Sequence, residues 1–310
     1  MWPIAATRRT GEALRTVAVT NHKGGSAKTT TTVNLAAALG EAGQRVLVID
    51  MDPQGSASAW LGISDPTTGV IQAIRGLAPL ASLLYETTAP GVQLVPSSPG
   101  LVVSDGREET DIAMGFIKAM EQLPSMWDIV LVDCPPSMGY LGVAPIAICR
   151  EILVPVEVHV LALAGLASLL ATVRRVQSRL NPSLEITAVL ACRVNRTSHA
   201  RVVIERLRES FPDTFMATEI RESIRLAEAP GMKLPITRYA PGSTGDRDYR
   251  AAASEFLQAV TEGQPVAEQE EESSRLSRMF RSSRHRPWVS RGSPLQIEPR
   301  RTLESRRGGD

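Results

Sequence analysis

The sequence contains few cysteines and no long hydrophobic run, and each absence argues against a class of protein. Only three of the 310 residues are cysteine, and Cys134, Cys149 and Cys192 are widely spaced. This spacing suggests neither a disulfide framework nor a structural zinc site. No stretch approaches ~20 consecutive apolar residues, and the first residues lack the charged-then-apolar order of a secretory signal. We therefore expect a cytoplasmic protein that is neither exported nor membrane-spanning.

The chain also lacks any large excess of charge. Its 34 Lys and Arg residues face 33 Asp and Glu residues, a net charge of +1, which argues against a uniformly basic nucleic-acid binder. The distribution is uneven, because residues 275–310 hold ten arginines and only three acids. The remaining residues therefore carry six more acids than bases, and an acidic body precedes a basic tail.

Short apolar runs alternate with longer helical patterns along the chain. Most of these runs are apolar throughout, as expected for parallel strands that are buried on both faces. The pattern predicts an α/β fold, a doubly wound and mostly parallel sheet with helices on both faces. In such a sheet, ligands bind beyond the carboxyl ends of the strands. The predicted strands are 16–20, 46–49, 92–95, 129–132, 152–154 and 186–190.

The alternation of strands and helices defines the domain organisation. It continues without a Pro/Gly/Ser-rich linker over residues 15–262, which we interpret as one domain. Residues 1–14 form a short N-terminal extension. From Gly263 the composition changes to acidic residues and then to Ser, Arg and Pro with few large apolar side chains. We expect residues 263–310 to be a basic, mostly disordered tail.

A glycine-rich segment joins the first predicted strand to a helical run over residues 31–43. It reads Asn-His-Lys-Gly-Gly-Ser-Ala-Lys-Thr-Thr over residues 21–30. Such a turn aims backbone N–H groups and the positive end of a helix dipole at one point, which suits phosphate. Lys28 would reach the β- and γ-phosphates and Thr29 would ligate Mg²⁺. However, His22 and Ala27 occupy glycine positions of the usual P-loop pattern. On this motif alone, a glycine-containing turn that binds no ligand remains an alternative interpretation.

Two carboxylate-bearing segments follow other predicted strands. One is Asp-Met-Asp-Pro-Gln-Gly over residues 50–55, and the other is Asp-Cys-Pro-Pro-Ser over residues 133–137. Both lie at carboxyl ends of strands, where a phosphate site is expected. A single aspartate at such a place is also a common helix cap or turn residue. We do not expect Cys134 to act as a nucleophile, because no histidine or other base is placed to activate it.

Together the three segments resemble the ParA/MinD superfamily of deviant Walker A ATPases, which are P-loop NTPases. The resemblance implies that Lys23 reaches across an ATP-dependent homodimer to the partner's nucleotide, that Asp52 positions the attacking water, and that Lys28 binds phosphate. It also implies that Thr29 and Asp133 hold Mg²⁺ with support from Asp50. Relatives usually have glycine at the position of Ala27, so its methyl group is expected to reduce nucleotide affinity. The implied nucleotide-binding residues are Lys23, Gly24, Gly25, Ser26, Ala27, Lys28, Thr29 and Thr30.

The resemblance continues beyond these motifs and covers roughly residues 15–260. Residues 152–166 are similar to the family's strand and interface helix. Residues 220–230 resemble the I-P-R-N-V-R-L-S-E-A-P segment of ParA partitioning proteins. MinD proteins lack this segment and the D-P-Q-G sequence, so the chain is most similar to Soj-like ParA proteins. Because only about 15 residues precede the first predicted strand, we expect no N-terminal helix-turn-helix domain.

Residues 193–250 contain 11 basic and eight acidic groups. Arg221 and Arg225 match the two arginines of the ParA segment, which implies contacts with the phosphates of non-specific DNA. A solvated surface with local ion pairs is the alternative interpretation. Asn195 follows the last predicted strand, where relatives place residues around the adenine. It is the candidate for contact with the base.

The function implied by the resemblance is a weak, partner-stimulated ATPase that uses ATP and Mg²⁺. The ATP-bound dimer would bind non-specific DNA, and a ParB-like protein would stimulate hydrolysis. Such a protein is cytoplasmic and nucleoid-associated. It would partition or position a plasmid, a chromosome or a protein assembly, and the sequence does not indicate which cargo it is.

Two other functions remain open. A MinD-like spatial regulator at a membrane would use the tail, where Leu276, Met279 and Phe280 form one short amphipathic turn. Membrane attachment is the less favoured interpretation, because basic disordered tails more often bind nucleic acid or acidic partners. An electron-transfer or metabolic enzyme of the same superfamily would need cluster-ligating cysteines or a substrate domain, and the sequence suggests neither.

Overall fold

The computed structural model describes residues 14–101, 106–136, 139–159 and 162–259. The N-terminal extension and the basic tail, with its amphipathic turn, lie outside this range. No helix within the described residues is long and apolar enough to cross a bilayer.

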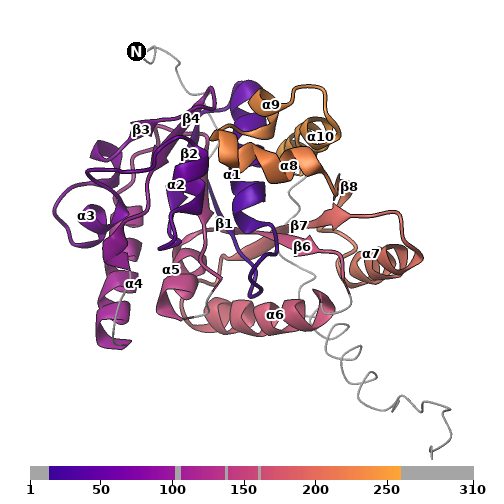
Figure 1. Cartoon of the computed structure of the whole chain (residues 1–310). Coiled ribbons are helices and arrows are strands. Elements are labelled where there is room, and N and C mark those ends of the chain that lie inside the picture. The colour runs from indigo at the N-terminus through magenta and orange to yellow at the C-terminus, as the bar shows by residue number, and fades with distance from the viewer. Residues whose placement is uncertain (1–13, 102–105, 137–138, 160–161, 260–310) are drawn as a thin grey trace, which may run out of the picture. The chain divides into compact units, whose positions relative to one another are not determined.

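The centre of the domain is an eight-stranded sheet with the order β3-β4-β2-β5-β1-β6-β7-β8 (Figure 1). All neighbouring strands are parallel except β3 and β4. The predicted doubly wound, mostly parallel α/β fold is therefore confirmed. The strands are β1 Arg15–Val19, β2 Val46–Asp50, β3 Tyr85–Glu86, β4 Val92–Val95, β5 Ile129–Asp133, β6 Glu151–Glu157, β7 Glu185–Val194 and β8 Phe215–Arg221.

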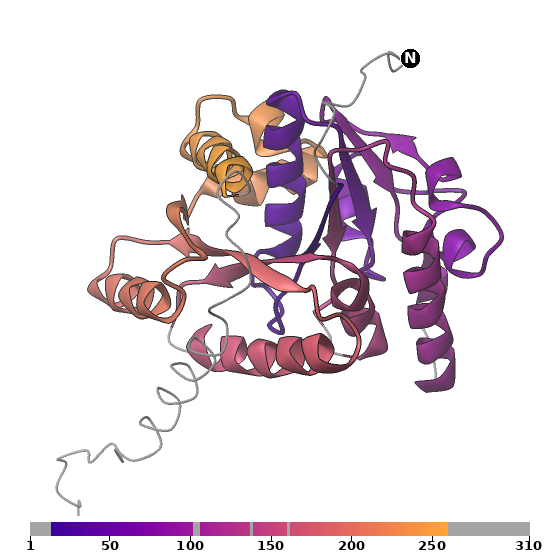
Figure 2. The ribbon, with the colours of Figure 1, turned by 180° about the vertical axis from the view of Figure 1, so that it is seen from behind.

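Helices cover the sheet on both faces (Figures 1 and 2). Three short 3₁₀ turns, η1 Leu80–Ser82, η2 Pro99–Leu101 and η3 Ala229–Met232, complete the described elements. The α-helices are α1 Lys28–Glu41, α2 Ser56–Trp60, α3 Val70–Ile74, α4 Gly106–Glu121, α5 Tyr140–Ile148, α6 Ala162–Arg179, α7 Ser198–Ser210, α8 Ile224–Glu228, α9 Ile236–Tyr239 and α10 Thr244–Gln258.

The pleat of the strands explains why two helical layers are needed. Val46 and Val48 of β2 belong to a core cluster that includes the buried faces of α1 and α10. Leu47 and Ile49 point to the opposite face of the sheet, and they are also fully buried. The second face is therefore covered as well, and α4, α5 and α6 pack one against the next on the other side of the domain.

Two strands were not predicted, β6 and β7 are longer than predicted, and one helix begins earlier than predicted. β8 and the two-residue β3 are not among the predicted strands. In β8, Thr218 and Glu219 interrupt the apolar residues, so this strand lacks a wholly apolar run. β3 is too short to leave a pattern. Helix α1 begins at Lys28 rather than at residue 31. Its first turn is polar, so the apolar periodicity appears only later in the helix.

The sheet order places one strand between two sets of crossovers. β1 lies between β5 and β6: the chain passes from β1 to β2 on one side of it, and from β5 to β6 across to the other side, so the strand order reverses at β1. The loop after β1 therefore opens into the crevice where such sheets bind ligands. The strand register also brings Asp133 beside both Val19 of β1 and Asp50 of β2. The predicted chemical residues thus meet at one edge of the sheet.

Candidate functional site

The loop between β1 and α1 is shaped by two residues with left-handed backbone conformations. Gly25 has a φ of 76° and Ala27 a φ of 66°. A Cβ atom built on Gly24 or Gly25 would meet no heavy atom within 4 Å, so the outer side of the loop is open. The loop ends at α1, whose first N–H groups and dipole therefore face the same open space.

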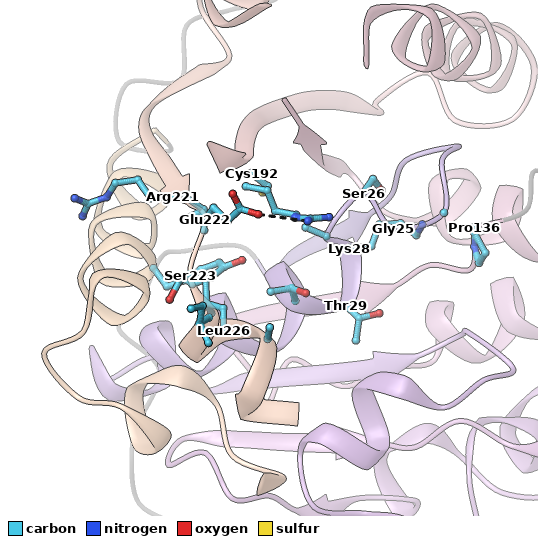
Figure 3. Close-up of a pocket in the computed structure, with 18 of the residues that line it drawn as sticks. Gly25, Ser26, Lys28, Thr29, Pro136, Cys192, Arg221, Glu222, Ser223 and Leu226 are labelled. Carbon is cyan, nitrogen blue, oxygen red and sulfur yellow. Dashed lines mark ion pairs between the residues drawn. The ribbon is translucent and has the colours of Figure 1, made fainter. Parts of the chain in front are cut away.

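A cavity of about 650 Å³ lies in front of this loop. Figure 3 shows residues of the loop and of α1 on one side of the cavity and residues of β8 and α8 on the other. Asp52 and Pro136 also line it, so all three predicted motifs meet there. The lining residues are Gly24, Gly25, Ser26, Ala27, Lys28, Thr29, Thr30, Asp52, Pro136, Cys192, Arg193, Ile220, Arg221, Glu222, Ser223, Ile224, Leu226, Ala227 and Tyr249.

Two groups of the loop are suited to an anion. The Lys28 ammonium donates a hydrogen bond to the Lys23 carbonyl oxygen at 3.2 Å, and burial lowers the pKa of Lys28. The Ser26 hydroxyl is buried and has no hydrogen-bond partner among the described residues. Buried polar groups in proteins are normally hydrogen-bonded. A phosphate in the cavity would supply the partner that Ser26 lacks and the negative charge that Lys28 requires.

The Asp133 carboxylate is held by two hydroxyls of α1. Thr29 Oγ1 donates to one carboxylate oxygen at 2.8 Å, and Thr32 Oγ1 donates to the other at 2.9 Å. Asp133 is fully buried, and this burial raises its pKa, with a further rise from the neighbouring Asp50. A carboxylate beside a threonine hydroxyl is a set of hard oxygen ligands of the kind that Mg²⁺ prefers. The residues present therefore fit Mg²⁺ together with a phosphate group.

Asp50 lies behind this pair rather than on the cavity wall. Its carboxylate accepts hydrogen bonds from Ser58, through the backbone N–H at 2.8 Å and the hydroxyl at 2.7 Å. It also accepts one from the Asp52 N–H at 3.1 Å. Burial raises the pKa of Asp50. Its described contacts are those of a group that fixes the loop after β2, and magnesium support stays a prediction.

Asp52 lines the cavity and is partly exposed. Its carboxylate accepts a hydrogen bond from the Gln54 N–H at 3.0 Å, as a turn residue does. Its carbonyl oxygen accepts one from the Ser97 hydroxyl at 2.6 Å. Asp52 therefore stabilises the turn after β2. It also has the access to the cavity that a water-positioning role requires.

Lys23 projects away from the lining of the cavity. Its ammonium lies 3.6 Å from a carboxylate oxygen of Glu157, at the end of β6, and contacts the imidazole of His159. The side chain is 41% exposed. The two lysines of the loop are thus separated, with Lys28 at the cavity and Lys23 at the protein surface.

The base and DNA candidates lie in different surroundings. Asn195 is exposed and accepts a hydrogen bond from the Thr197 hydroxyl. It follows β7 and is not among the described residues that line the cavity, whereas Cys192 and Arg193 of β7 are. Arg221 forms an ion pair with the nearly buried Asp248, and Arg225 forms one with Glu228. Both arginines therefore form the local ion pairs that were the alternative to DNA contacts in the sequence analysis.

Several residues of the site were not found from the sequence. Thr32 lies one helical turn after Thr29, and this spacing within a run of four threonines is a signal that could have identified it. Ser58, Glu157, Arg193 and Tyr249 reach the site from α2, β6, β7 and α10, and no sequence motif links them to the loop. Burial raises the pKa of the Cys134 thiol, which agrees with the expectation that it is no nucleophile.

Comparison with known proteins agrees with this geometry. A family model described as "AAA domain" matches residues 14–186. The chromosome-partitioning ATPase Soj of Thermus thermophilus is 38% identical over 251 residues, which cover 80% of this chain and 98% of that protein. The chromosome partitioning protein ParA of Myxococcus xanthus is 34% identical over 261 residues, with 81% and 90% covered. The chain belongs to the ParA/MinD superfamily of P-loop ATPases.

A solved structure is also similar to this ParA/MinD-type domain. It is cobyrinic acid a,c-diamide synthase from Mycobacterium smegmatis with a bound ATP analogue and magnesium. Its sequence is 28% identical and its TM-score is 0.67, with 81% of this chain and 98% of that chain covered. The similarity extends over nearly all of the described domain.

The strained backbone at Ala27 generates a testable prediction. Its methyl group packs against the core cluster as well as lining the cavity. In Ala27→Gly, relief of about 1–2 kcal/mol of left-handed strain is offset by the loss of about 0.8 kcal/mol of methyl burial and by the greater freedom of unfolded glycine. We expect the free energy of unfolding to change by less than about 1 kcal/mol.

In contrast, Ala27→Val places a β-branched residue in the same conformation and should cost about 2 kcal/mol or more. Chemical denaturation of the two variants measures the difference. Equal stability of the valine and glycine variants would show that Ala27 is not held in this conformation.

Proposed function

We propose that the protein is a ParA-type ATPase that dimerises on ATP, binds non-specific DNA and partitions or positions a cargo. The observation that carries the proposal is the arrangement of the two lysines around the loop. Lys28 is buried at the cavity beside Asp133 and Thr29, whereas Lys23 extends from the same loop to the surface. This arrangement provides one lysine for the protein's own nucleotide and a second one at the surface, which another molecule could contact once it separates from Glu157.

The cavity would hold the nucleotide through groups that already converge on it. Lys28, the Ser26 hydroxyl and the loop N–H groups would bind the phosphates, and Thr29 and Asp133 would hold Mg²⁺. Mg²⁺ in such a site neutralises negative charge on the phosphates. The apolar and polar side chains of β7, β8 and α8 on the opposite wall would receive the ribose and the base.

Hydrolysis requires a group that orients water next to the terminal phosphate. Asp52 and Glu222 are the two carboxylates among the lining residues, since Asp133 is buried under two threonine hydroxyls and Asp50 under Ser58. Glu222 lies on the opposite wall and is paired with Arg193, whereas the charge of Asp52 acts on Lys28. We assign the water-positioning role to Asp52 for this reason. Lys23 would complete the site of the partner subunit in the ATP-bound dimer.

DNA binding is supported by the charge of two exposed surfaces. α6 carries Arg174, Arg175 and Arg179 and no acidic residue, and these three arginines have no ion pair within the described part of the chain. Arg225 is paired with Glu228, but both side chains are largely exposed, so the pair is readily exchanged for a phosphate. Arg221 is a poorer candidate, because its partner Asp248 is only 7% exposed and depends on it.

Two of the relatives are named as chromosome-partitioning proteins, which supports a role in partitioning a cargo. A ParB-like protein is the expected stimulating partner. A second candidate function is ATP-dependent metabolic chemistry. It is favoured by the similarity to cobyrinic acid a,c-diamide synthase. ATP hydrolysis would be common to both functions, so DNA binding by the ATP-bound protein is the property that separates them.

The assignment of Asp52 predicts a specific loss of hydrolysis. Asp52→Asn keeps an acceptor for the Gln54 N–H but removes the charge that orients water. We expect turnover of ATP to fall about 10²–10⁴-fold, with ATP affinity within about threefold of the wild type, since the ground state is held by other groups. Asp65→Asn, at an exposed position that does not line the cavity, is the matched control. Wild-type turnover in Asp52→Asn would place the catalytic role elsewhere.

The DNA proposal predicts binding that depends on ATP and Mg²⁺ and is independent of sequence, because contacts with phosphates carry no base information. Arg225→Glu should reduce affinity at least about tenfold and lower the log–log salt slope by about two, one contact from each subunit. Fluorescence anisotropy with two DNA duplexes of unrelated sequence measures both. Arg75→Glu, a charge reversal at an exposed residue that directly follows α3 and does not line the cavity, is the control.

Deletion of residues 275–310 tests the other source of DNA affinity. If the deletion abolishes binding and Arg225→Glu does not, the basic tail is the DNA-binding element. If the wild type does not bind DNA with ATP and Mg²⁺, the partitioning proposal fails.

A further inference from the structure

A cluster of charged side chains lies beside the cavity and is not part of the proposed phosphate or magnesium site. Its centre is Glu157, whose side chain is 20% exposed. One carboxylate oxygen lies 3.6 Å from the Lys23 ammonium, and the other lies 2.7 Å from the Arg193 guanidinium. Glu157 therefore joins the surface lysine of the loop to β7, and we refer to Glu157, Lys23 and Arg193 as the Glu157 clamp.

Arg193 is fixed independently of Lys23. It has a left-handed backbone, with a φ of 53°, a conformation that a non-glycine residue keeps only where its surroundings impose it. Its guanidinium also lies 3.5 Å from a carboxylate oxygen of Glu222, which follows β8, and this pair is the dashed line in Figure 3. Arg193 thus holds the Glu157 carboxylate in place from the cavity side.

The Lys23 end of the clamp is fixed at both its main chain and its side chain. The Lys23 carbonyl accepts the hydrogen bond of Lys28, and the ammonium contacts Glu157 and the imidazole of His159. All these partners belong to the same protomer. Lys23, which would complete the partner's site, therefore makes its contacts within its own protomer. It has to separate from Glu157 before it can bind another molecule.

We propose that Glu157 is a positioning residue for Lys23, which holds this lysine in its own protomer and thereby opposes ATP-dependent dimerisation. The inference rests on the proposed function, because it takes dimerisation as the step in which Lys23 acts. When Lys23 leaves Glu157 and binds the phosphates of the partner subunit, one Glu157 clamp opens in each subunit. The concentration of ATP and protein at which the dimer forms then depends on the strength of the clamp.

The expected size of the effect follows from the exposure of the pair. Partly exposed ion pairs shift an equilibrium by up to about fivefold. Because two clamps open in each dimer, Glu157→Gln should raise the dimer association constant with ATP and Mg²⁺ by up to about 25-fold. Analytical ultracentrifugation at several protein concentrations measures this constant.

Two variants separate the contact from a simple change of charge. Glu219→Gln removes one negative charge from β8, outside the cavity lining, and the partner of Arg208, but it leaves the Lys23–Glu157 pair in place. It should dimerise within about twofold of the wild type. Glu157→Asp keeps the charge and should restore much of the wild-type constant. Equal shifts in Glu157→Gln and Glu219→Gln would overturn the proposal.

A second measurement needs neither ATP nor dimerisation. An amine-reactive ester is applied to the nucleotide-free protein, and the labelling rate of Lys23 is followed by peptide mass spectrometry. Release of the ammonium in Glu157→Gln should raise this rate severalfold, and Glu219→Gln should not. An unchanged rate overturns the clamp itself. A raised rate in a protein that never dimerises with ATP supports the clamp and instead contradicts the proposed function.

Discussion

The position of the whole phosphate site depends on the two hydrogen bonds that hydroxyls of α1 donate to Asp133. Thr29 and Thr32 occupy successive turns of one helix face, and their hydroxyls bind the two oxygens of a carboxylate that is otherwise sealed between strands. A buried carboxylate without such partners is strongly destabilising. The two bonds therefore lock the start of α1 to the end of β5, and this lock sets where Lys28 and the loop N–H groups point. Ala27 takes its left-handed conformation at the turn that leads into this helix.

The parts of the fold and site that could be predicted are those encoded in contiguous residues. Wholly apolar runs predict β2 and β5 because both faces of these strands are buried. The loop residues, Asp52 and Asp133 could be assigned because short motifs place them at strand ends, where a parallel sheet gathers its ligands. The hydrogen bond between Thr29 and Asp133 confirms that the glycine-rich loop and the segment after β5 meet. Neither motif by itself predicts that they lie within hydrogen-bond distance.

Features that rest on pairings between distant segments could not be predicted. Ser58 reaches Asp50, and Asp248 reaches Arg221 across 27 residues, through packing that no local pattern records. The interpretation of Arg221 as a DNA contact came from a motif, whereas its fixed pairing comes from the position of α10. Ala27 was expected to crowd the phosphates, yet its methyl group also packs against the core. β8, at the edge of the sheet, escaped prediction because Thr218 and Glu219 interrupt its apolar residues.

The most direct test of the account is ATP binding by Lys28→Ala. Lys28 is buried and lines the cavity, and one charge-assisted contact with phosphate contributes about 1.5–3 kcal/mol. Isothermal titration calorimetry with Mg²⁺ should therefore show a loss of affinity of about tenfold to more than a hundredfold. Lys118→Ala, which removes an exposed lysine on α4, should bind as the wild type does. Wild-type affinity in a folded Lys28→Ala protein would contradict the assignment of this cavity to the nucleotide.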